Sequence, residues 1–342
     1  MNTAAVFHHR GIEAALKVAQ VAQVASTLTI ARPENFPFIK DVSYNEGKLL
    51  LIDHGMASSA SDCREVVMMK IVGHTMGTPE ATLLEAMDLF AELGLDGIEI
   101  ICADDYPCGL NLESSQSDLS SVRQRAVDAG LVIAGLVPYT KDTNHPEAMA
   151  RQRAIADLKR AVDIAVALDC RAIRVFGGHE VPPGEQGIAF GRLAESLREV
   201  GEYAATASVQ LNIENHMDTM ATSAEMTMAI ARAVDLSNVG VLYDQANLAF
   251  MNTEVYEMAI ALQGPRIQHV HVKDFYWHGT QRVAAVLGQG IIPWAQIIGA
   301  LTDLGYEGFY SLEYERRWFP DQLPPAAVGM KQSLDFLRGT QR

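Results

Sequence analysis

The sequence is poor in cysteine, and its thiols follow no recognisable spacing. Cysteines stand only at positions 63, 102, 108 and 170, so no C-x-x-C pair occurs. Irregular spacing of this kind is typical of buried or incidental thiols in a reducing compartment. Candidate functional residues must therefore come from other residue types.

Basic residues are also scarce. The chain has 27 Lys and Arg against 42 Asp and Glu, which gives a formal net charge of −15. Binding a polyanion requires clustered Lys and Arg, so this charge argues against a nucleic-acid partner. The glycine pair Gly177–Gly178 does not begin a G-x-G-x-x-G motif, so a dinucleotide site is not supported either.

Long apolar runs are missing as well. No stretch approaches the roughly 18–20 uncharged apolar residues that a membrane span needs. Residues 1–17, MNTAAVFHHRGIEAALK, lack the uninterrupted apolar core and the cleavage pattern of a signal peptide. We therefore expect a cytoplasmic protein without a membrane partner.

The chain nevertheless has enough apolar material for a large core. Its hydrophobic content is 49% and its aromatic content 7%, with no biased tract. At 342 residues it exceeds one ordinary domain, but a (β/α)₈ barrel alone takes about 250 residues. One barrel with an extension is the simplest organisation.

From residue 66 onward, strand-like and helix-like segments alternate. The strand-like segments are 66–74, 97–105, 131–140, 171–178, 209–216, 239–247, 267–274 and 307–315. The helix-like segments are 78–94, 115–130, 146–169, 185–207, 222–235, 253–263, 293–304 and 324–338, the first opened by a Thr cap and closed by Gly94. Regular alternation predicts a parallel sheet with right-handed crossovers, and eight units predict closure into an α/β (β/α)₈ TIM barrel over residues 66–342.

Residues 1–65 lie outside this count. They contain an amphipathic helical pattern near the start and a short strand-like segment at 47–55. We expect an N-terminal extension that packs on the barrel, with an arm over the substrate as the alternative.

The last four strand-like segments carry ionisable side chains on one face. Alternate residues of a strand point to opposite faces, and one face of these segments is apolar. That face comprises Leu211, Ile213, Val241, Tyr243, Val270, Val272, Tyr310, Leu312 and Tyr314. The opposite face holds Glu214, Asp244, His271 and Glu313, one near the C-terminal end of each segment, where TIM barrels place their active sites.

Three carboxylates and one imidazole form an O/N ligand set that suits Mn²⁺, Mg²⁺, Co²⁺ or Zn²⁺. Taken singly, Glu214 could be an interior ion-pair partner and His271 a core histidine. Four such residues in phase on consecutive strands indicate instead one divalent ion, held by Glu214, Asp244, His271 and Glu313. We expect Mn²⁺.

Other ionisable residues share this face. His269 should lie deeper in the barrel, behind the ligands or in the packing. His216 should lie above the ion, as an acid/base or a substrate-orienting group, with a hydrogen-bonded loop residue as the alternative. Glu315 should lie near the rim, either binding a substrate hydroxyl or solvated.

Positive charge accompanies the acidic cluster. Lys273, with Arg316 or Arg317 after the last strand, could hold a carboxylate, a phosphate or a developing enolate oxygen, or could simply offset the carboxylates. Arg174 has the inward parity of its strand and is a further candidate for substrate contact. Glu99, Lys70 and His74 are also inward, and an interior Lys–Glu ion pair would account for the first two without any function.

At these residues the chain resembles the sugar phosphate isomerase/epimerase family, the xylose-isomerase-like TIM barrels. The resemblance covers about residues 66–340 and rests on GLDGIEI (94–100), LNIENH (211–216), LYDQAN (242–247), HVHVKD (269–274) and YEGFYSLEYERRW (306–318). It implies one metal held by Glu214, Asp244, His271 and Glu313. In the ketose epimerases of the family, the two glutamates also exchange the substrate proton.

Two departures bear on the reaction. The ketose epimerases usually have a histidine three residues past the aspartate, where this chain has Asn247, as in the inosose dehydratase branch. The E-N-H context of His216 also resembles relatives that use a histidine base for β-elimination. Asn247 is included with Lys273, Arg174 and Arg317 among the candidate substrate-binding residues.

We expect a divalent-metal-dependent sugar isomerase or epimerase that acts through a metal-stabilised enediolate, with Glu214, Glu313 and His216 as catalytic residues. The alternative is a metal-dependent dehydratase or C-glycoside-type lyase with His216 as the base. An apurinic endonuclease would need more histidine ligands and a basic groove, and a non-catalytic sugar-binding subunit would have a broken ligand set. The substrate should be a small sugar or sugar derivative. We expect a homo-oligomer, or a hetero-oligomer if the chain is a lyase subunit.

Overall fold

The computed structural model describes residues 68–340, together with the backbone of residues 42–45 and 48–51. The latter two segments, β1 (Val42–Asn45) and β2 (Lys48–Leu51), pair antiparallel as a hairpin. The expected packing of residues 1–65 on the barrel lies outside the described residues.

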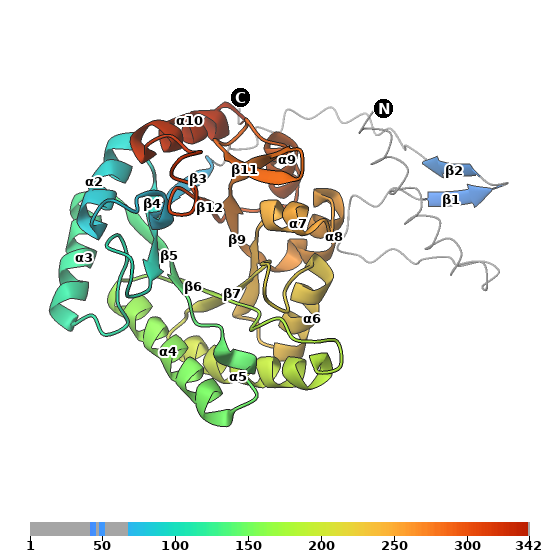
Figure 1. Cartoon of the computed structure of the whole chain (residues 1–342), viewed down its shortest axis with the longest axis horizontal. Coiled ribbons are helices and arrows are strands. Elements are labelled where there is room, and N and C mark those ends of the chain that lie inside the picture. The colour runs from blue at the N-terminus through green and yellow to red at the C-terminus, as the bar shows by residue number, and fades with distance from the viewer. Residues whose placement is uncertain (1–41, 46–47, 52–67, 341–342) are drawn as a thin grey trace, which may run out of the picture. The chain divides into compact units, whose positions relative to one another are not determined.

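Eight parallel strands close into a barrel in the order β12-β3-β4-β5-β6-β7-β8-β9, which confirms the predicted TIM barrel (Figure 1). The strands are β3 (Lys70–His74), β4 (Gly97–Cys102), β5 (Val132–Pro138), β6 (Ala172–Val175), β7 (Gln210–Glu214), β8 (Val239–Tyr243), β9 (Ile267–Val272) and β12 (Phe309–Leu312). Closure leaves this sheet without a free edge.

Helices ring the barrel (Figure 1). They are α2 (Leu83–Leu93), α3 (Gln116–Asp128), α4 (Ala148–Ala167), α5 (Gln186–Thr206), α6 (Ala224–Val234), α7 (Gln245–Met251), α8 (Tyr256–Gln263), α9 (Trp294–Asp303) and α10 (Ala326–Gly339), with the 3₁₀ turns η1 (Thr75–Gly77), η2 (Asp142–Asn144) and η3 (Gly264–Arg266). Between residues 68 and 340, none of these helices is long and apolar enough to cross a membrane.

The first helix of the barrel begins later than the sequence pattern indicates. Thr82 caps it, accepting from the backbone N–H of Glu85 while the Glu85 carboxylate accepts from the N–H of Thr82. This reciprocal pair satisfies two N–H groups that a helix start leaves free. Gly94 ends the helix as predicted, with a φ of 77° that a side chain would disfavour.

The apolar face of each strand packs under the helices, as strand parity predicts. Leu211, Ile213, Val270, Val272 and Leu312 are at most 2% exposed and share one hydrophobic cluster with helix residues such as Leu197 and Ile230. Cys102, Cys108 and Cys170 are also buried. The opposite faces of the same strands are therefore left to line the barrel interior.

A hairpin follows β9 that the sequence pattern did not reveal. Strands β10 (Asp274–His278) and β11 (Gln281–Ala285) pair antiparallel, so Asp274 belongs to this hairpin and not to a barrel strand. Trp277 stacks on Phe250 with ring centroids 6.0 Å apart and an interplanar angle of 15°. The hairpin carries Arg282 back toward the C-terminal mouth of the barrel, where that residue pairs with Glu315.

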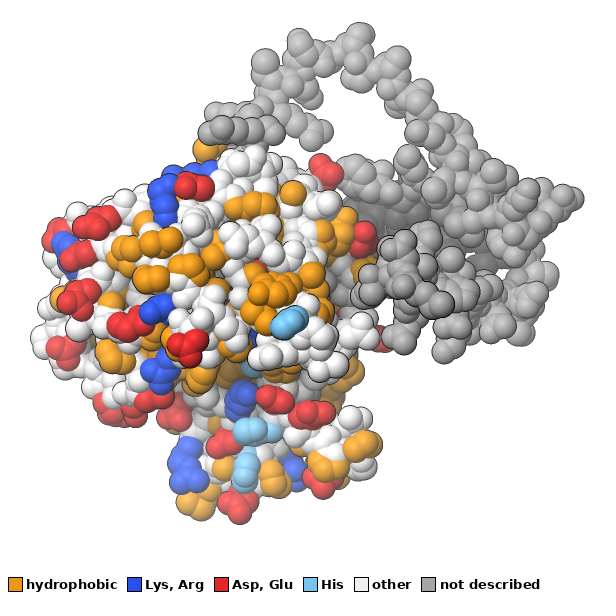
Figure 2. Space-filling view, turned by 45° about the horizontal axis from the view of Figure 1, so that its top comes forward, with side chains coloured by type: hydrophobic (Ala, Val, Ile, Leu, Met, Phe, Trp, Pro, Cys, Tyr) orange, Lys and Arg blue, Asp and Glu red, His pale blue; other side chains and the backbone are white. Residues whose placement is uncertain are grey.

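Basic side chains lie singly or in small groups beside acidic ones on the face shown in Figure 2. A nucleic-acid groove would instead gather Lys and Arg into a stripe.

Candidate metal centre

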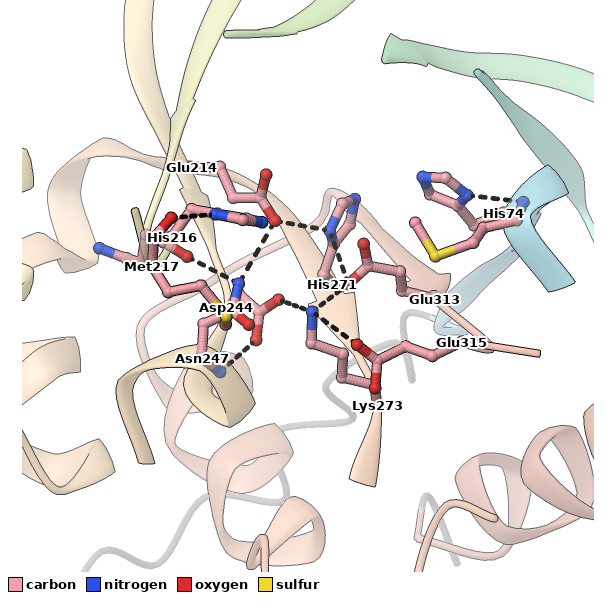
Figure 3. Close-up of polar contacts among 12 residues, drawn as sticks. His74, Glu214, His216, Met217, Asp244, Asn247, His271, Lys273, Glu313 and Glu315 are labelled. Atoms are coloured by element: carbon pink, nitrogen blue, oxygen red, sulfur yellow. Dashed lines mark hydrogen bonds and ion pairs between the residues drawn. The ribbon is translucent and has the colours of Figure 1, made fainter. Parts of the chain in front are cut away.

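Four side chains converge where the last four strands of the barrel end (Figure 3). Glu214 is the last residue of β7, Asp244 follows β8, His271 lies in β9, and Glu313 follows β12. One ligand atom of each lies within 4.8 Å of the others, and all four residues are buried. These residues, the tetrad from here on, are the four that strand parity selected.

The orientation of His271 favours a cation at the centre of the tetrad. Its Nε2 lies 2.9 Å from a carboxylate oxygen of Glu99, while its Nδ1 lies 3.4 Å from Glu214 Oε1 and 3.3 Å from Glu313 Oε2. When Nε2–H donates to Glu99, the lone pair of Nδ1 faces two carboxylate oxygens. Nδ1 has no hydrogen-bond partner within the described region. A positive charge must balance these three groups, and the donor set fits a divalent ion.

Titration of His271 points the same way. Burial alone would lower its pKa, but the charges of Glu313 and Glu99 raise it well above the usual value. The surrounding carboxylates therefore stabilise a positive charge at this ring. A proton can fill that role, and a metal ion would displace it.

One oxygen of the Asp244 carboxylate accepts a backbone hydrogen bond, and the other is free to face the centre of the tetrad. Its Oδ1 accepts from the backbone N–H of Asn247 at 2.9 Å, which makes Asp244 the N-cap of α7. Burial raises the pKa of Asp244 to about 7, against the opposing effect of the Lys273 charge. The cap fixes the carboxylate with Oδ2 turned inward.

Lys273 lies inside the site rather than on its rim. Its Nζ is 2.8 Å from Asp244 Oδ2, 2.5 Å from Glu313 Oε2 and 3.9 Å from a Glu315 oxygen. Burial would lower the pKa of Lys273, but Asp244 and Glu313 raise it well above the usual range. The lysine therefore stays charged beside two residues of the tetrad.

Glu315 is buried too, in contrast to a rim position. It pairs with Arg282 from β11, a residue that the sequence pattern did not single out. Burial raises the pKa of Glu315, and the charges of Lys273 and Arg282 oppose that rise. Arg282 of the hairpin thus balances the charge of Glu315 in the site.

Arg174 and His216 flank Glu214. Arg174 Nη1 lies 3.6 Å from Glu214 Oε2, and its guanidinium stacks 3.6 Å from the ring of Phe176. The Nδ1 of His216 lies 2.5 Å from the carbonyl of Met217, and its ring meets Phe176 edge-on. Burial would raise the pKa of Glu214, but the charges of His216 and Arg174 contribute to lowering it to about 2.

The two remaining candidate substrate-binding residues, Asn247 and Arg317, both have partners within the protein. Asn247 donates to the carbonyl of Asn215 at 2.9 Å and reaches Glu214 Oε1 at 3.5 Å, so it supports the wall of the site. Arg317 pairs with Asp105 at 3.1 Å and stacks over Tyr106, and Arg316 pairs with Glu80. No contact of Arg317 with the tetrad is found among residues 68–340.

Lys70 and Glu99 do not form the interior ion pair that would account for them without function. Lys70 donates to the carbonyl of Glu307, whereas Glu99 lies 3.2 Å from His269 Nε2 and 2.9 Å from His271 Nε2. His269 is therefore deeper than His271, as parity predicted, and both rings share one carboxylate. The inward parity of Glu99 was visible in the sequence, but its partner was not.

Comparison with known proteins places this geometry in a family. Residues 87–340 match the family described as "Xylose isomerase-like TIM barrel". The chain is 28% identical over 248 residues to a D-psicose 3-epimerase of Enterocloster bolteae, covering 66% of this chain and 75% of the relative. An inosose dehydratase of Geobacillus thermodenitrificans is 27% identical over 139 residues, which is 36% of this chain and 46% of that protein.

A solved structure of D-psicose 3-epimerase in the presence of D-fructose has the same fold. It superposes with a TM-score of 0.66 at 20% identity, covering 80% of this chain and 99% of the other. The family match spans most of the barrel and includes all four residues of the tetrad. The chain is therefore a member of the xylose isomerase-like TIM barrel family.

Proposed function

We propose that the protein is a divalent-metal-dependent sugar epimerase or isomerase. The observation that carries this proposal is the convergence of Glu214, Asp244, His271 and Glu313 within 4.8 Å at the mouth of the barrel. The epimerase relative supports it, since that relative is named for exchanging configuration at a sugar carbon. The tetrad would hold the ion.

Manganese is our first choice of ion, ahead of Mg²⁺, Co²⁺ and Zn²⁺, because three carboxylates and one imidazole form a mainly hard ligand set. When bound, such an ion supplies a Lewis acid that polarises a substrate carbonyl and makes the neighbouring C–H more acidic.

Two glutamates are arranged to move the proton. Glu214 and Glu313 come from the outer strands of the four-strand arc β7-β8-β9-β12, so they approach the centre from its two sides. The pKa of each is lowered, Glu214 to about 2 and Glu313 well below its usual value, despite burial. In its ionised form, either glutamate could accept the proton from carbon. Epimerisation would further require the opposite glutamate, in its protonated form, to deliver a proton to the other face.

Lys273 and Arg174 would bind the oxygens of the substrate. Lys273 is a buried ammonium beside Asp244 and Glu313. Arg174 is 3% exposed, and its Nε and Nη1 find no hydrogen-bond partner among the described residues. Donors of this kind stabilise charge that develops on oxygen during carbon-acid chemistry. Asn247 would contact the substrate from the wall of the site. Arg317 would reach it only from the mouth of the barrel.

A second candidate is β-elimination with His216 as the base. Its Nδ1 faces the Met217 carbonyl, so Nδ1 carries the proton and Nε2 keeps its lone pair. Burial lowers the pKa of His216, against the raising effect of the Glu214 charge. The inosose dehydratase relative and Asn247 also favour this reading.

Isotope exchange tests the reaction class. Metal-loaded protein is incubated in deuterated water with a panel of ketoses, inososes and 3-keto-glycosides. Epimerisation or isomerisation places solvent deuterium on the carbon beside the carbonyl, whereas elimination yields an unsaturated or cleaved product. Turnover without exchange at any carbon, under reversible conditions, would overturn carbon-acid chemistry.

His216→Ala separates the two candidates. If His216 is the base, turnover should fall about 10²–10⁴-fold while the metal stays bound. If Glu214 and Glu313 exchange the proton, the same variant should mainly raise KM. His179→Ala is the matched control, because His179 pairs with Asp142 on a partly exposed loop.

We also propose four further properties of the protein. They are a small sugar or sugar-derived substrate, a homo-oligomer, a cytoplasmic location, and residues 66–342 as the catalytic domain. Sedimentation of the full-length protein tests the oligomer directly.

A further inference from the structure

His74 is a buried histidine whose ring can exist in only one neutral form. It ends β3 and is 0% exposed. The backbone N–H of Met76 donates to its Nδ1 at 3.1 Å, which starts the turn η1. A nitrogen that accepts a hydrogen bond uses its lone pair, so the proton of the neutral ring is on Nε2. Since Nδ1 accepts from Met76, it carries no proton, and a ring with its single proton on Nε2 is uncharged.

The Nε2–H of this ring has nothing to donate to. It is buried and has no hydrogen-bond partner within residues 68–340. Buried donors are almost always paired, because an unpaired one gives up its bond to water without replacement. An unpaired donor of fixed orientation in a wall of the site indicates an acceptor that arrives from outside.

The position of His74 is beside the tetrad. Strand β3 pairs with β12 on one side and β4 on the other, with Gly73 opposite Leu312 and His74 opposite Glu99. His74 therefore follows Gly73 at the level where Glu313 follows Leu312. Its ring is nearly perpendicular to that of His271, with centroids 5.4 Å apart.

Figure 3 shows the same relationship. One edge of the His74 ring is bonded to the backbone of Met76, and the other edge is turned toward His271. A ligand atom of His74 lies within 4.8 Å of one each on Glu99 and His271. An oxygen atom of a molecule bound at the tetrad would lie within reach of the free edge.

A second metal ion is the competing explanation for this group. Glu99 already receives the Nε2–H of His271 at 2.9 Å, and the Nε2 of His269 lies 3.2 Å from its other oxygen. The other nitrogen of His271 faces the tetrad, and the Nδ1 of His74 receives Met76. An ion would have to displace these bonds, whereas an acceptor oxygen would need only the unused N–H.

We propose that His74 binds the substrate, its Nε2–H donating to a hydroxyl or carbonyl oxygen of the sugar. This inference rests on the proposed function for the identity of the ligand as a sugar. With Nδ1 accepting from Met76 and the proton on Nε2, the ring supplies direction and selectivity for an oxygen acceptor without adding positive charge. A sugar oxygen one or two atoms from the chelating pair is the expected partner.

Two isosteric substitutions give opposite expectations. The amide nitrogen of His74→Gln occupies roughly the place of Nε2, so it can keep the donor while losing the acceptor for Met76. The amide of His74→Asn occupies roughly the place of Nδ1, so it can keep that acceptor while losing the donor. If His74 binds substrate, the His74→Asn variant should have a kcat/KM about tenfold below that of wild type, and the His74→Gln variant should lose less. If His74 only starts η1, the order reverses and the inference is overturned.

Metal content is measured on the same proteins. One ion in wild type and in both variants agrees with the inference. Two ions in wild type, falling to one in both variants, would overturn it in favour of the second metal site.

A measurement without turnover separates this inference from the proposed function. In ¹⁵N-histidine-labelled, Mg²⁺-loaded protein we expect the Nε2–H tautomer for His74, and a shift of that N–H signal when D-fructose is added. An Nδ1–H tautomer, or a signal that does not respond to D-fructose, would refute the inference even if the enzyme epimerises ketoses. Lack of turnover on the whole panel with a responsive signal would refute the epimerase proposal and leave His74 as a sugar-binding residue.

Discussion

Glu99 holds the Nε2 of His271 at 2.9 Å, so the opposite nitrogen of that ring faces Glu214 and Glu313. Glu99 comes from β4, which lies four strands away from β8 and Asp244 in the barrel order. It nevertheless determines which nitrogen of His271 is available to the tetrad. A carboxylate behind a metal-binding imidazole fixes its tautomer and makes it a better ligand. Glu99 would therefore act on the metal without touching it.

Glu99→Gln should weaken Mn²⁺ binding about 10–100-fold, since the neutral amide no longer fixes the proton of His271 on Nε2. Titration calorimetry on the metal-free protein measures this affinity. Glu92→Gln is the control, because Glu92 is exposed on α2. An affinity unchanged from wild type in Glu99→Gln would show that the orientation of His271 does not depend on this carboxylate.

Glu214→Gln and Glu313→Gln should each sharply lower metal occupancy, because each replaces a charged ligand of the tetrad by a neutral one. Elemental analysis after reconstitution gives the occupancy, and we expect one ion per chain in wild type. Metal should also raise the midpoint of thermal unfolding of wild type, by more than it raises that of either variant, since binding stabilises only the folded state. Carefully reconstituted wild type without a stoichiometric ion would contradict the metal site.

Strand parity was sufficient to place the tetrad on the inward face, because the period of a strand is fixed by covalent geometry. Glu214, Asp244, His271 and Glu313 alternate with core residues such as Leu312, and the barrel brings the ends of adjacent strands together. The family resemblance fixed the same four positions.

What the sequence could not supply were partners across the barrel. Glu99 has inward parity, but whether it meets Lys70 or the two histidines depends on side-chain rotamers and strand tilt. The tautomer of His74 depends on a backbone N–H in the following turn. Neither contact leaves a periodic signal.

The hairpin β10–β11 was missed for a different reason. Asp274 stands only two residues beyond the end of β9, so the predicted strand was extended to include it. The turn itself carries a glycine, Gly279, with a φ of 64°, which is the kind of residue that a tight connection requires. Arg282, the partner of Glu315, could be recognised only once this hairpin was known.

Leu211→Ala should lower the free energy of unfolding by about 2–4 kcal/mol, through lost burial and the cavity that remains. Leu211 is 0% exposed between β7 and the helical layer, whereas Leu304, at the end of α9, is 45% exposed. Leu304→Ala is therefore the control and should change stability by less than about 0.5 kcal/mol. Equal effects of the two variants in urea unfolding would contradict the assignment of the outward face.

Asp274 anchors the segment that follows the hairpin, and it stands next to Lys273 in the site. Its carboxylate accepts four backbone N–H groups, from Phe275 at 2.9 Å, Gly288 and Gly290 at 3.0 Å, and Ile292 at 3.1 Å. Asp274→Asn replaces one oxygen by an amide that cannot accept, which leaves two of these N–H groups facing another donor. We expect a loss of about 2–4 kcal/mol in the free energy of unfolding.

Gly290→Ala tests the same anchor from the other side, because a Cβ at position 290 would collide with the Asp274 carboxylate. Both variants should also lower the activity of the metal-loaded enzyme, since a displaced Asp274 moves the ammonium of Lys273 away from Asp244 and Glu313. Asp303→Asn, at an exposed position on α9, should leave stability and activity unchanged. If Asp274→Asn unfolds at the same urea concentration as wild type, the four hydrogen bonds do not hold this segment, and the position of Lys273 must be fixed chiefly by the bond from Trp294 Nε1 to its carbonyl.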